Sequence, residues 1–160
     1  MTGDVFLRDV LKEDFPVFFE HQLDPDACEM AAFAARDRDV FMLHWEDILS
    51  DDTVAKKTIL FNGRVAGYIV SFGQADERQL GYWIGKAFWA KGIATRALST
   101  FLCFLKTRPL YAHVAQHNLA SLRVLEKCGF TIYGEDTAPS EEGNPEVQEF
   151  VLRLGPDGGS

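Results

Sequence analysis

The sequence predicts a single α+β domain. Its 160 residues are a typical single-domain length and can bury one substantial core. Strand-like apolar runs and segments of helical periodicity follow one another along the chain. No repeat, linker or low-complexity block divides them. We therefore expect one domain over residues 1–154 and a disordered tail at residues 155–160.

The first third of the chain predicts one short strand followed by helices. The strand is expected at residues 5–8. Residues 12–22 carry three phenylalanines at helical spacing, and Pro16 is tolerated only in the first turn of a helix. Residues 24–52 are rich in acidic and small side chains, and we expect one or two helices there.

The clearest local signal is a hairpin centred on Asn62-Gly63. This pair separates the strand-like runs 58–61 and 64–72. Asn and Gly both accept positive φ, which a tight two-residue hairpin turn requires. A polar turn at residues 74–78 then leads into a third strand at residues 79–84.

The second half of the chain predicts two helices and three strands. Apolar residues recur on one face between Ala94 and Leu105, as expected for a helix of about three turns. Gly129 is placed to end the second helix in the left-handed conformation. The remaining elements are strand 110–114, helix 119–125 and two closing strands at 130–133 and 149–154, joined by a loop rich in Pro, Gly and Glu.

The charge balance excludes some classes of partner. The net charge is −8, from 24 acidic and 16 basic residues. Nonspecific binding to nucleic acid or to an anionic membrane needs a basic face, so we expect neither partner. A negative surface would suit a cationic amine, although ordinary solubility explains the total charge equally well.

The cysteines and the apolar runs point to a cytoplasmic protein. Cys28, Cys103 and Cys128 are odd in number and form no CxxC pair, so we interpret them as reduced packing residues. The first residues lack the basic-then-apolar order of a signal peptide. No apolar run approaches the ~20 residues that span a bilayer.

Residues 88–96 have the composition of a phosphate-binding loop. Ala90, Gly92 and Ala94 are small, and they lie between a predicted strand and a predicted helix. Small residues let a ligand approach the backbone, and the free N–H groups of a first helical turn attract phosphate. The loop is neither a Walker A nor a GxGxxG motif. A plain strand-to-helix turn remains the alternative.

A second segment, Asn118-Leu119-Ala120-Ser121 followed by Lys127-Cys128-Gly129-Phe130, favours the ligand-binding interpretation. Asn118 alone is simply a good helix N-cap. Together with Trp89-Ala90-Lys91-Gly92-Ile93-Ala94, however, it resembles the GNAT superfamily of N-acetyltransferases. The resemblance covers residues 79–133, and Gly81-Tyr82-Trp83-Ile84 is similar to the branch that contains the ribosomal-protein N-terminal acetyltransferases.

This resemblance implies a fold, a cosubstrate and a mechanism. The fold is a mixed, mostly antiparallel twisted sheet flanked by helices. Acetyl-CoA is the cosubstrate, no metal is needed, and an amine attacks the thioester directly in a ternary complex. The residues expected to bind acetyl-CoA are Trp89, Ala90, Lys91, Gly92, Ile93, Ala94, Thr95 and Asn118.

Two positions depart from the family pattern. Trp89 replaces the usual Arg or Gln at the head of the loop, and Leu125 stands where many members place a proton-donating tyrosine. Ser121 is therefore the candidate to meet the departing thiolate. We expect no acyl intermediate on Cys103 or Cys128, because no His/Asp arrangement supports one.

The general base and the acceptor site are less constrained. Glu77 precedes the strand predicted at residues 79–84, near where many family members carry a catalytic acidic residue. It is our first candidate for the general base. The other candidates are His44, His113 and His117. His44, Trp45 and Tyr82 are expected to line the acceptor pocket, with specificity set by residues 20–55 and 134–147.

The acceptor is expected to be a small-molecule amine or a protein N-terminus, and the chain a monomer or homodimer. Two rival functions remain open. One is a non-catalytic CoA-binding sensor of the same fold. The other is an ATP- or NAD-binding protein, although the chain lacks both the Walker Lys-Ser/Thr and the Rossmann acidic partner.

Overall fold

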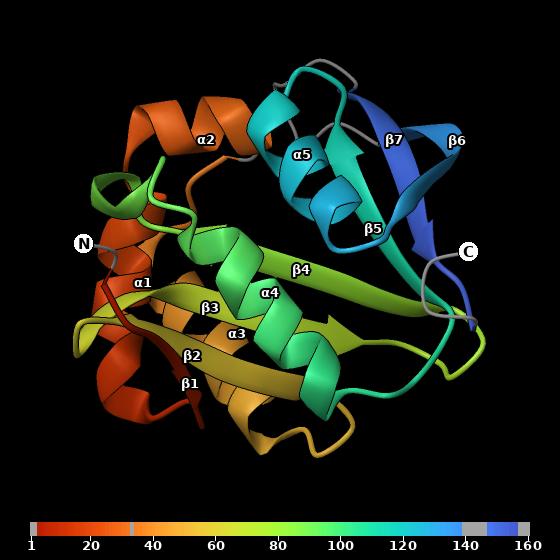
Figure 1. The fold of residues 1–160 in the computed structure, drawn as a ribbon. Helices are drawn as coiled ribbons and strands as arrows, with labels where there is room; N and C mark the ends of the chain where they lie inside the picture. The colour runs from red at the N-terminus through yellow and green to blue at the C-terminus, as the bar shows by residue number, and fades with distance from the viewer. Residues whose placement is uncertain (1–2, 33, 139–146, 157–160) are drawn as a thin grey trace.

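A seven-stranded sheet forms the centre of the protein (Figure 1). The computed structural model describes residues 3–32, 34–138 and 147–156. Its strands are β1 (Val5–Arg8), β2 (Ala55–Phe61), β3 (Arg64–Phe72), β4 (Arg78–Ile84), β5 (Leu110–Ala115), β6 (Thr131–Ala138) and β7 (Val147–Leu154), in the order β1-β2-β3-β4-β5-β7-β6. All neighbouring pairs are antiparallel except β4 and β5. The predicted α+β class and the mostly antiparallel sheet are confirmed.

Helices cover both faces of this sheet. They are α1 (Phe15–Gln22), α2 (Pro25–Ala31), α3 (Arg38–Ser50), α4 (Ile93–Phe104) and α5 (Leu119–Lys127), with short 3-10 turns η1 (Lys12–Asp14) and η2 (Lys86–Phe88). Helices α4 and α5 lie on one face and share a large core with the strands. Helices α1 and α3 lie on the other face, where they form a second core against β3. The two cores leave the sheet buried on both sides at its centre.

Several local sequence signals produce the expected structures. Pro16 lies in the first turn of α1, where its missing N–H costs nothing. The 24–52 segment forms two helices, α2 and α3. Asn62 and Gly63 take φ of 51° and 81° in the hairpin turn. Gly129 follows α5 with φ of 97°, as a left-handed helix ending requires. Of the predicted tail, residues 157–160 lie outside the described residues.

The sheet opens between its two central strands. β4 and β5 pair only at Arg78–Leu110 and Gln79–Tyr111. Beyond these pairs β5 stays hydrogen-bonded to β7 over its whole length, while β4 continues along β3 as far as Gly67–Ile84. The two strands therefore diverge, and Figure 1 shows the gap widening toward the first turns of α4 and α5.

A buried carboxylate ties the first strand to the rest of the protein. Asp14 is only 2% exposed and receives two 2.7 Å hydrogen bonds from the guanidinium of Arg8. It also accepts bonds from the Thr58 hydroxyl at 2.7 Å and the Leu11 backbone at 2.9 Å. Burial opposes its charge, but these donors outweigh that effect and lower the pKa of Asp14. The network joins β1, η1 and β2.

Replacing Asp14 with Asn should destabilise the fold by about 2–4 kcal/mol, because Arg8 loses its buried partner. Since the folded pKa lies below the unfolded value, the carboxylate stabilises above the unfolded pKa, and this contribution is lost as pH falls through the folded pKa. Urea unfolding of wild type and Asp14→Asn at several pH values measures both effects. Asp9→Asn, which removes a surface pair with Lys57, should cost under about 1 kcal/mol. Equal losses in the two variants would contradict this account.

Candidate functional site: the opening between two strands

The loop at residues 89–92 is held by its own tryptophan. The Trp89 indole N–H donates to the Ile84 carbonyl at 2.9 Å, which folds the ring back on the end of β4. Ala90 and Gly92 both have positive φ, at 60° and 73°. Because of this turn, Ala90, Lys91 and Gly92 are all exposed, beside the opening. Trp89 therefore acts here as a support for the loop.

The N-terminus of α4 presents backbone donors at this loop. Gly92 is the N-cap and has no side chain with which to cap the helix. The first helical bond runs from Arg96 N to Gly92 O, which leaves the N–H groups before Arg96 without intrahelical partners. The first turn contains no acidic residue, and Lys91 and Arg96 add positive charge. Such an end binds anions such as a phosphate.

The N-terminus of α5 lies on the other side of the opening. Asn118 caps it, with Oδ1 accepting from Ser121 N at 3.2 Å. The Ser121 hydroxyl lies 2.6 Å from the Tyr82 hydroxyl of β4. Burial raises the pKa of Tyr82 to about 12, against a smaller lowering by the Ser121 hydrogen bond. The phenol is therefore neutral at physiological pH and can donate to Ser121.

The C-terminal end of α5 contacts the first turn of α4. The Cys128 thiol, at the end of α5, lies 3.7 Å from the Thr95 carbonyl in the first turn of α4. Burial raises the pKa of this thiol, so it remains protonated and suited to packing. The segments that the sequence singled out, 89–95 and 118–121, thus flank one opening.

Comparison with known proteins identifies the family. Residues 4–131, most of the chain, match the Acetyltransferase (GNAT) domain family. The chain belongs to the GNAT acetyltransferase family. No curated protein matches it in sequence. Membership makes the chain an acetyltransferase, as the motif had predicted.

Solved GNAT structures share the whole fold. A GNAT-family acetyltransferase from Bacillus anthracis superimposes with a TM-score of 0.81 at 16% identity, covering 98% of each chain. The spermidine N-acetyltransferase of Vibrio cholerae, solved with CoA and spermine, gives 0.83 at 13% identity over 96% of each chain. An aminoglycoside acetyltransferase solved with coenzyme A gives 0.80 at 17% identity, covering 97% of this chain and 96% of that one.

The predicted acceptor residues are not brought together. Trp45 is only 1% exposed and packs between Phe18 and Tyr68 in the core beneath α3. His44, its neighbour in α3, faces solvent. Partial desolvation of its ring and the positive charge of Arg36 lower the pKa of His44. Of the three residues, Tyr82 alone lies at the opening. An acceptor contact by His44 or Trp45 stays a prediction from sequence.

The candidate bases are scattered. Glu77 is exposed in the turn before β4, about 17 Å along the strand from Tyr82 at ~3.3 Å per residue. This is the end at which β4 and β5 are still paired, so the structure does not place Glu77 beside Ser121. His117 Nε2 lies 2.8 Å from the Glu29 carbonyl. His113 Nδ1 lies 3.4 Å from a carboxylate oxygen of Glu149.

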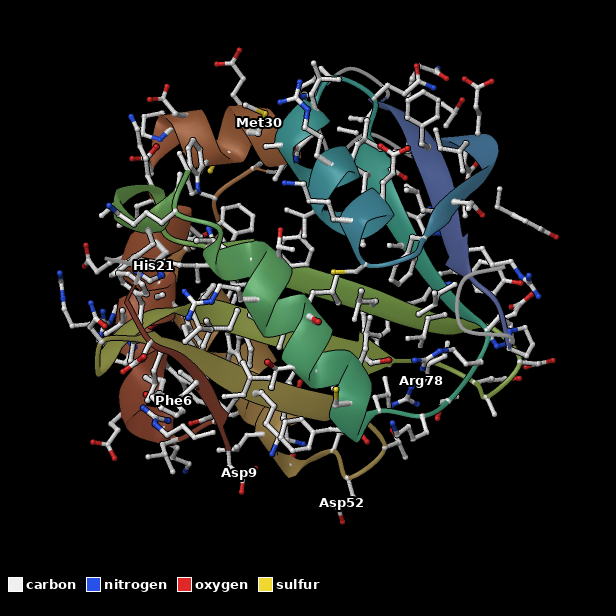
Figure 2. All side chains as sticks on the ribbon, viewed as in Figure 1. Phe6, Asp9, His21, Met30, Asp52 and Arg78 are labelled. Carbon is white, nitrogen blue, oxygen red and sulfur yellow. The ribbon has the colours of Figure 1, made fainter. Side chains whose placement is uncertain are left out.

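Helix α2 spans the wide end of the opening. Asp26 forms an ion pair with Lys86, in the turn η2 just before the loop. At the other end of the helix, the Glu29 carbonyl contacts His117, just before α5. One short helix thereby touches both of the segments that flank the gap, and Figure 2 shows Met30 beside α5. The sequence had predicted a helix here, but not this placement.

His21 is a further residue that sequence reasoning missed. Its ring lies directly on Gly85, where an added Cβ would be 2.6 Å from the imidazole. Burial lowers the pKa of His21, so the ring is neutral. The contact explains why a glycine stands at the end of β4. In the sequence, the close approach of the His21 ring to the backbone is signalled by the glycine at position 85, directly after the predicted strand 79–84.

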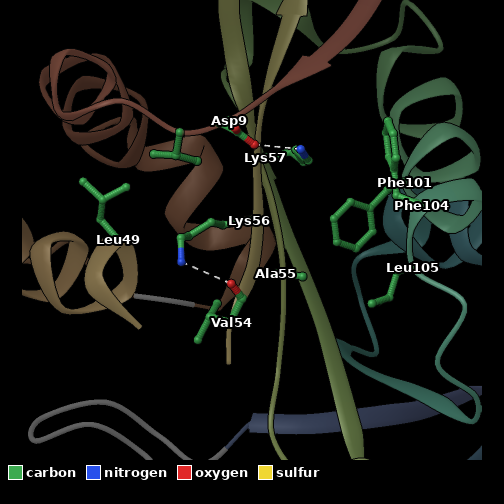
Figure 3. A pocket seen from close by; sticks show the side chains of 10 residues that line it. Asp9, Leu49, Val54, Ala55, Lys56, Lys57, Phe101, Phe104 and Leu105 are labelled. Atoms are coloured by element: carbon green, nitrogen blue, oxygen red, sulfur yellow. Dashed lines mark hydrogen bonds and ion pairs between the residues drawn. The ribbon is translucent and has the colours of Figure 1, made fainter. Parts of the chain in front are cut away.

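A pocket of about 360 Å³ lies at the far end of α4 (Figure 3). Phe101, Phe104 and Leu105 line one side, and Lys57 pairs with Asp9 at its rim. The pocket is roughly a helix length, ~18 Å, from the loop at Gly92. It is therefore separate from the opening.

Two negative findings concern the described part of the chain. Over residues 3–32, 34–138 and 147–156, no three His, Cys, Asp or Glu side chains are grouped as a metal site would require. Within the same ranges, no helix is long and apolar enough to cross a bilayer.

The Tyr82–Ser121 bond should be measurable in a double-mutant cycle. Ser121 is half-buried rather than solvent-facing, so removing either hydroxyl should cost about 1 kcal/mol. Urea unfolding of Tyr82→Phe, Ser121→Ala and the double variant should give a coupling energy of about 1 kcal/mol. Tyr133→Phe, at a 65% exposed tyrosine, should change stability by under about 0.5 kcal/mol. Strict additivity of the two single variants would show that the bond contributes nothing.

Proposed function

We propose that this protein transfers the acetyl group of acetyl-CoA to a primary amine by direct attack in a ternary complex. The observation that carries the proposal is the opening between β4 and β5, flanked by the donor-rich N-terminus of α4 and the Tyr82–Ser121 pair. The proposal covers one domain over residues 1–154. It is supported by family membership and by the CoA in two solved neighbours.

The cosubstrate fits the backbone of residues 90–95. A pyrophosphate needs several N–H donors and close approach, and the exposed, positive-φ Gly92 allows both. Lys91 can add a cationic contact from the loop, while Ile93 is buried in the core and contributes its N–H alone. Asn118 would border the chain of the cosubstrate from the α5 side.

The chemistry makes different demands at the nitrogen and at the sulfur. A lysine-like amine of pKa ~10.4 loses its proton at pH 7 at a cost of about 4–5 kcal/mol, and an α-amine of pKa ~8 at about 1.4 kcal/mol. A thiolate is a fair leaving group, since thiols have pKa ~8.5. It needs a hydrogen bond more than a strong acid. Ser121 can supply that bond while Tyr82 donates to it.

We assign Tyr82 a role in hydrogen bonding and not in proton transfer to the leaving group. Burial raises the pKa of its phenol to about 12, well above the ~8.5 of a thiol. The pair therefore stabilises the departing sulfur by hydrogen bonding. Leu125, which stands where many family members have a tyrosine, has no hydroxyl to offer. Its side chain is 1% exposed and packs in the core.

The acceptor is proposed to be a small-molecule amine or a protein N-terminus. Two of the solved neighbours are a spermidine N-acetyltransferase and an aminoglycoside acetyltransferase, whose named substrates are small amines. The motif resembles the branch with ribosomal-protein N-terminal acetyltransferases, which favours a peptide α-amine. A panel of spermidine, kanamycin and peptides with N-terminal Ser or Ala, followed by thiol release, distinguishes these acceptors. A CoA-binding sensor would bind acetyl-CoA and release no thiol with any of them.

Replacing Gly92 with Asn tests the cosubstrate site. Asn tolerates positive φ, so the fold should survive, while its side chain enters the space above the loop. We expect the Kd for acetyl-CoA, measured by calorimetry, to rise at least about tenfold. Gly63→Asn is the matched control, because Gly63 also has positive φ and open space but lies in the β2–β3 hairpin, outside the 90–95 segment. Unchanged affinity in folded Gly92→Asn would refute the placement of the pyrophosphate.

Replacing Ser121 with Ala tests the role at the sulfur. A hydrogen bond made only as the carbon–sulfur bond breaks should be worth about ten- to a hundredfold in kcat. The KM for acetyl-CoA should stay nearly constant. Ser99→Ala, at an exposed serine of α4, should leave kcat unchanged. Full kcat in folded Ser121→Ala, where chemistry limits turnover, would assign the protonation of the thiolate to water alone.

A further inference from the structure

The opening between β4 and β5 has a second face, away from α4 and α5. Side chains alternate along each strand, so Leu80 and Tyr82 face the α4–α5 core together with Ala112 and Val114. The residues between them point to the opposite face. These are Gly81 and Trp83 on β4 and Tyr111, His113 and Ala115 on β5.

On this second face, His113 stands across the opening from a glycine. Continuing the register of the Arg78–Leu110 pair places Gly81 at the level of His113. A Cβ on Gly81 would have only Val70 within 4 Å, at 3.8 Å, so nothing crowds the space on that side. The His113 side chain is 37% exposed. His113 is therefore partly exposed on this face, and in the continued register the residue across from it on β4 has no side chain.

Glu149 orients this imidazole. It lies on β7 opposite Ala115, diagonal to His113 on the same face of the sheet. Its carboxylate oxygen is 3.4 Å from His113 Nδ1, and its side chain is only 20% exposed. A carboxylate beside Nδ1 favours the tautomer that is protonated at that nitrogen, which leaves Nε2 as the acceptor. This is the usual arrangement of a histidine base and the group that orients it.

We propose that His113 is the general base of the acetyl transfer and that Glu149 is its positioning residue. The proposal rests on the proposed function. His113 Nε2 takes one proton from the acceptor ammonium, and the free amine nitrogen then bonds to the acetyl carbon. The carbon–sulfur bond breaks and CoA leaves as the thiolate. The second proton on the nitrogen passes to solvent as the amide forms, solvent protonates the thiolate, and the imidazolium returns its proton to solvent.

The position of this pair relative to Tyr82 and Ser121 suits the reaction. The hydroxyl pair lies on the α4–α5 face, and His113 lies on the other. The acceptor can then approach from one face while the sulfur leaves toward the other. None of the three alternative bases has this relation to the opening. His44 faces solvent from α3. Glu77 lies at the paired end of the strands, and His117 Nε2 contacts the Glu29 carbonyl.

The test compares two kinds of acceptor. One is the primary amine of the panel with the highest turnover, which must be deprotonated. The other is hydroxylamine, whose nitrogen is mainly unprotonated at neutral pH and needs little help from a base. His113→Ala should lower kcat/KM for the primary amine by about 10²–10⁴, and for hydroxylamine by less than about tenfold. Added imidazole should restore part of the loss with the primary amine only.

Further variants separate catalysis from structure. His113→Gln, which keeps a polar side chain of similar size, should show the same selective loss if His113→Ala folds poorly. Glu149→Gln should show a smaller loss of about tenfold with the same dependence on acceptor. Asp136→Asn, which alters the exposed carboxylate opposite Glu149 on β6, should leave both acceptors unaffected.

The outcomes are distinct. Equal losses with both acceptors, or full activity of His113→Gln with the primary amine, would overturn the assignment of the base. If the wild-type protein acetylates neither the panel amines nor hydroxylamine, the proposed function itself fails and the assignment fails with it. Activity of the wild type with hydroxylamine alone also overturns the base, because no amine is then deprotonated.

Discussion

The pairing of β4 with β5 stops after two residue pairs, and the placement of the site follows from that limit. β5 keeps its partner β7, and β4 keeps β3, so neither strand loses its support where they diverge. The loop after β4 leads into α4, and the turn after β5 leads into α5. Both helices therefore begin at the wide end of the same gap. A sheet with continuous pairing would have closed this space.

The two faces of the sheet divide the chemistry between them. On the α4–α5 face, neutral hydroxyls and free backbone donors suit phosphate and a departing sulfur. On the other face, an imidazole and a carboxylate suit a nitrogen that must lose protons. The hydroxyl pair and the imidazole–carboxylate pair are thus separated by the sheet itself. The acidic Asp14 network at the other end of the sheet has a purely structural task, holding β1 in place.

The features that could be predicted from the sequence were local conformations, which a few neighbouring residues determine. Asn62-Gly63, Pro16, Asn118 and Gly129 each impose a local conformation, and each was found where expected. The small residues of the loop at 89–92 likewise predicted its exposed backbone, while its binding of acetyl-CoA stays a prediction. Contacts between distant strands were not predictable: Tyr82 and Ser121 are 39 residues apart, and His113 and Glu149 meet only through the β5–β7 pairing. Trp45 looked like a pocket residue because no local pattern shows that α3 buries it.

The divergence of β4 from β5 also has a consequence for molecular recognition. Unpaired strand edges at the rim of a sheet invite other proteins to add a strand, and natural folds guard against this. Here two such edges face each other inside one domain. Each edge is backed by its own neighbour, β3 behind β4 and β7 behind β5. The unpaired backbone groups are therefore presented within the domain, where a strand of another protein cannot reach them as it reaches the rim of a sheet.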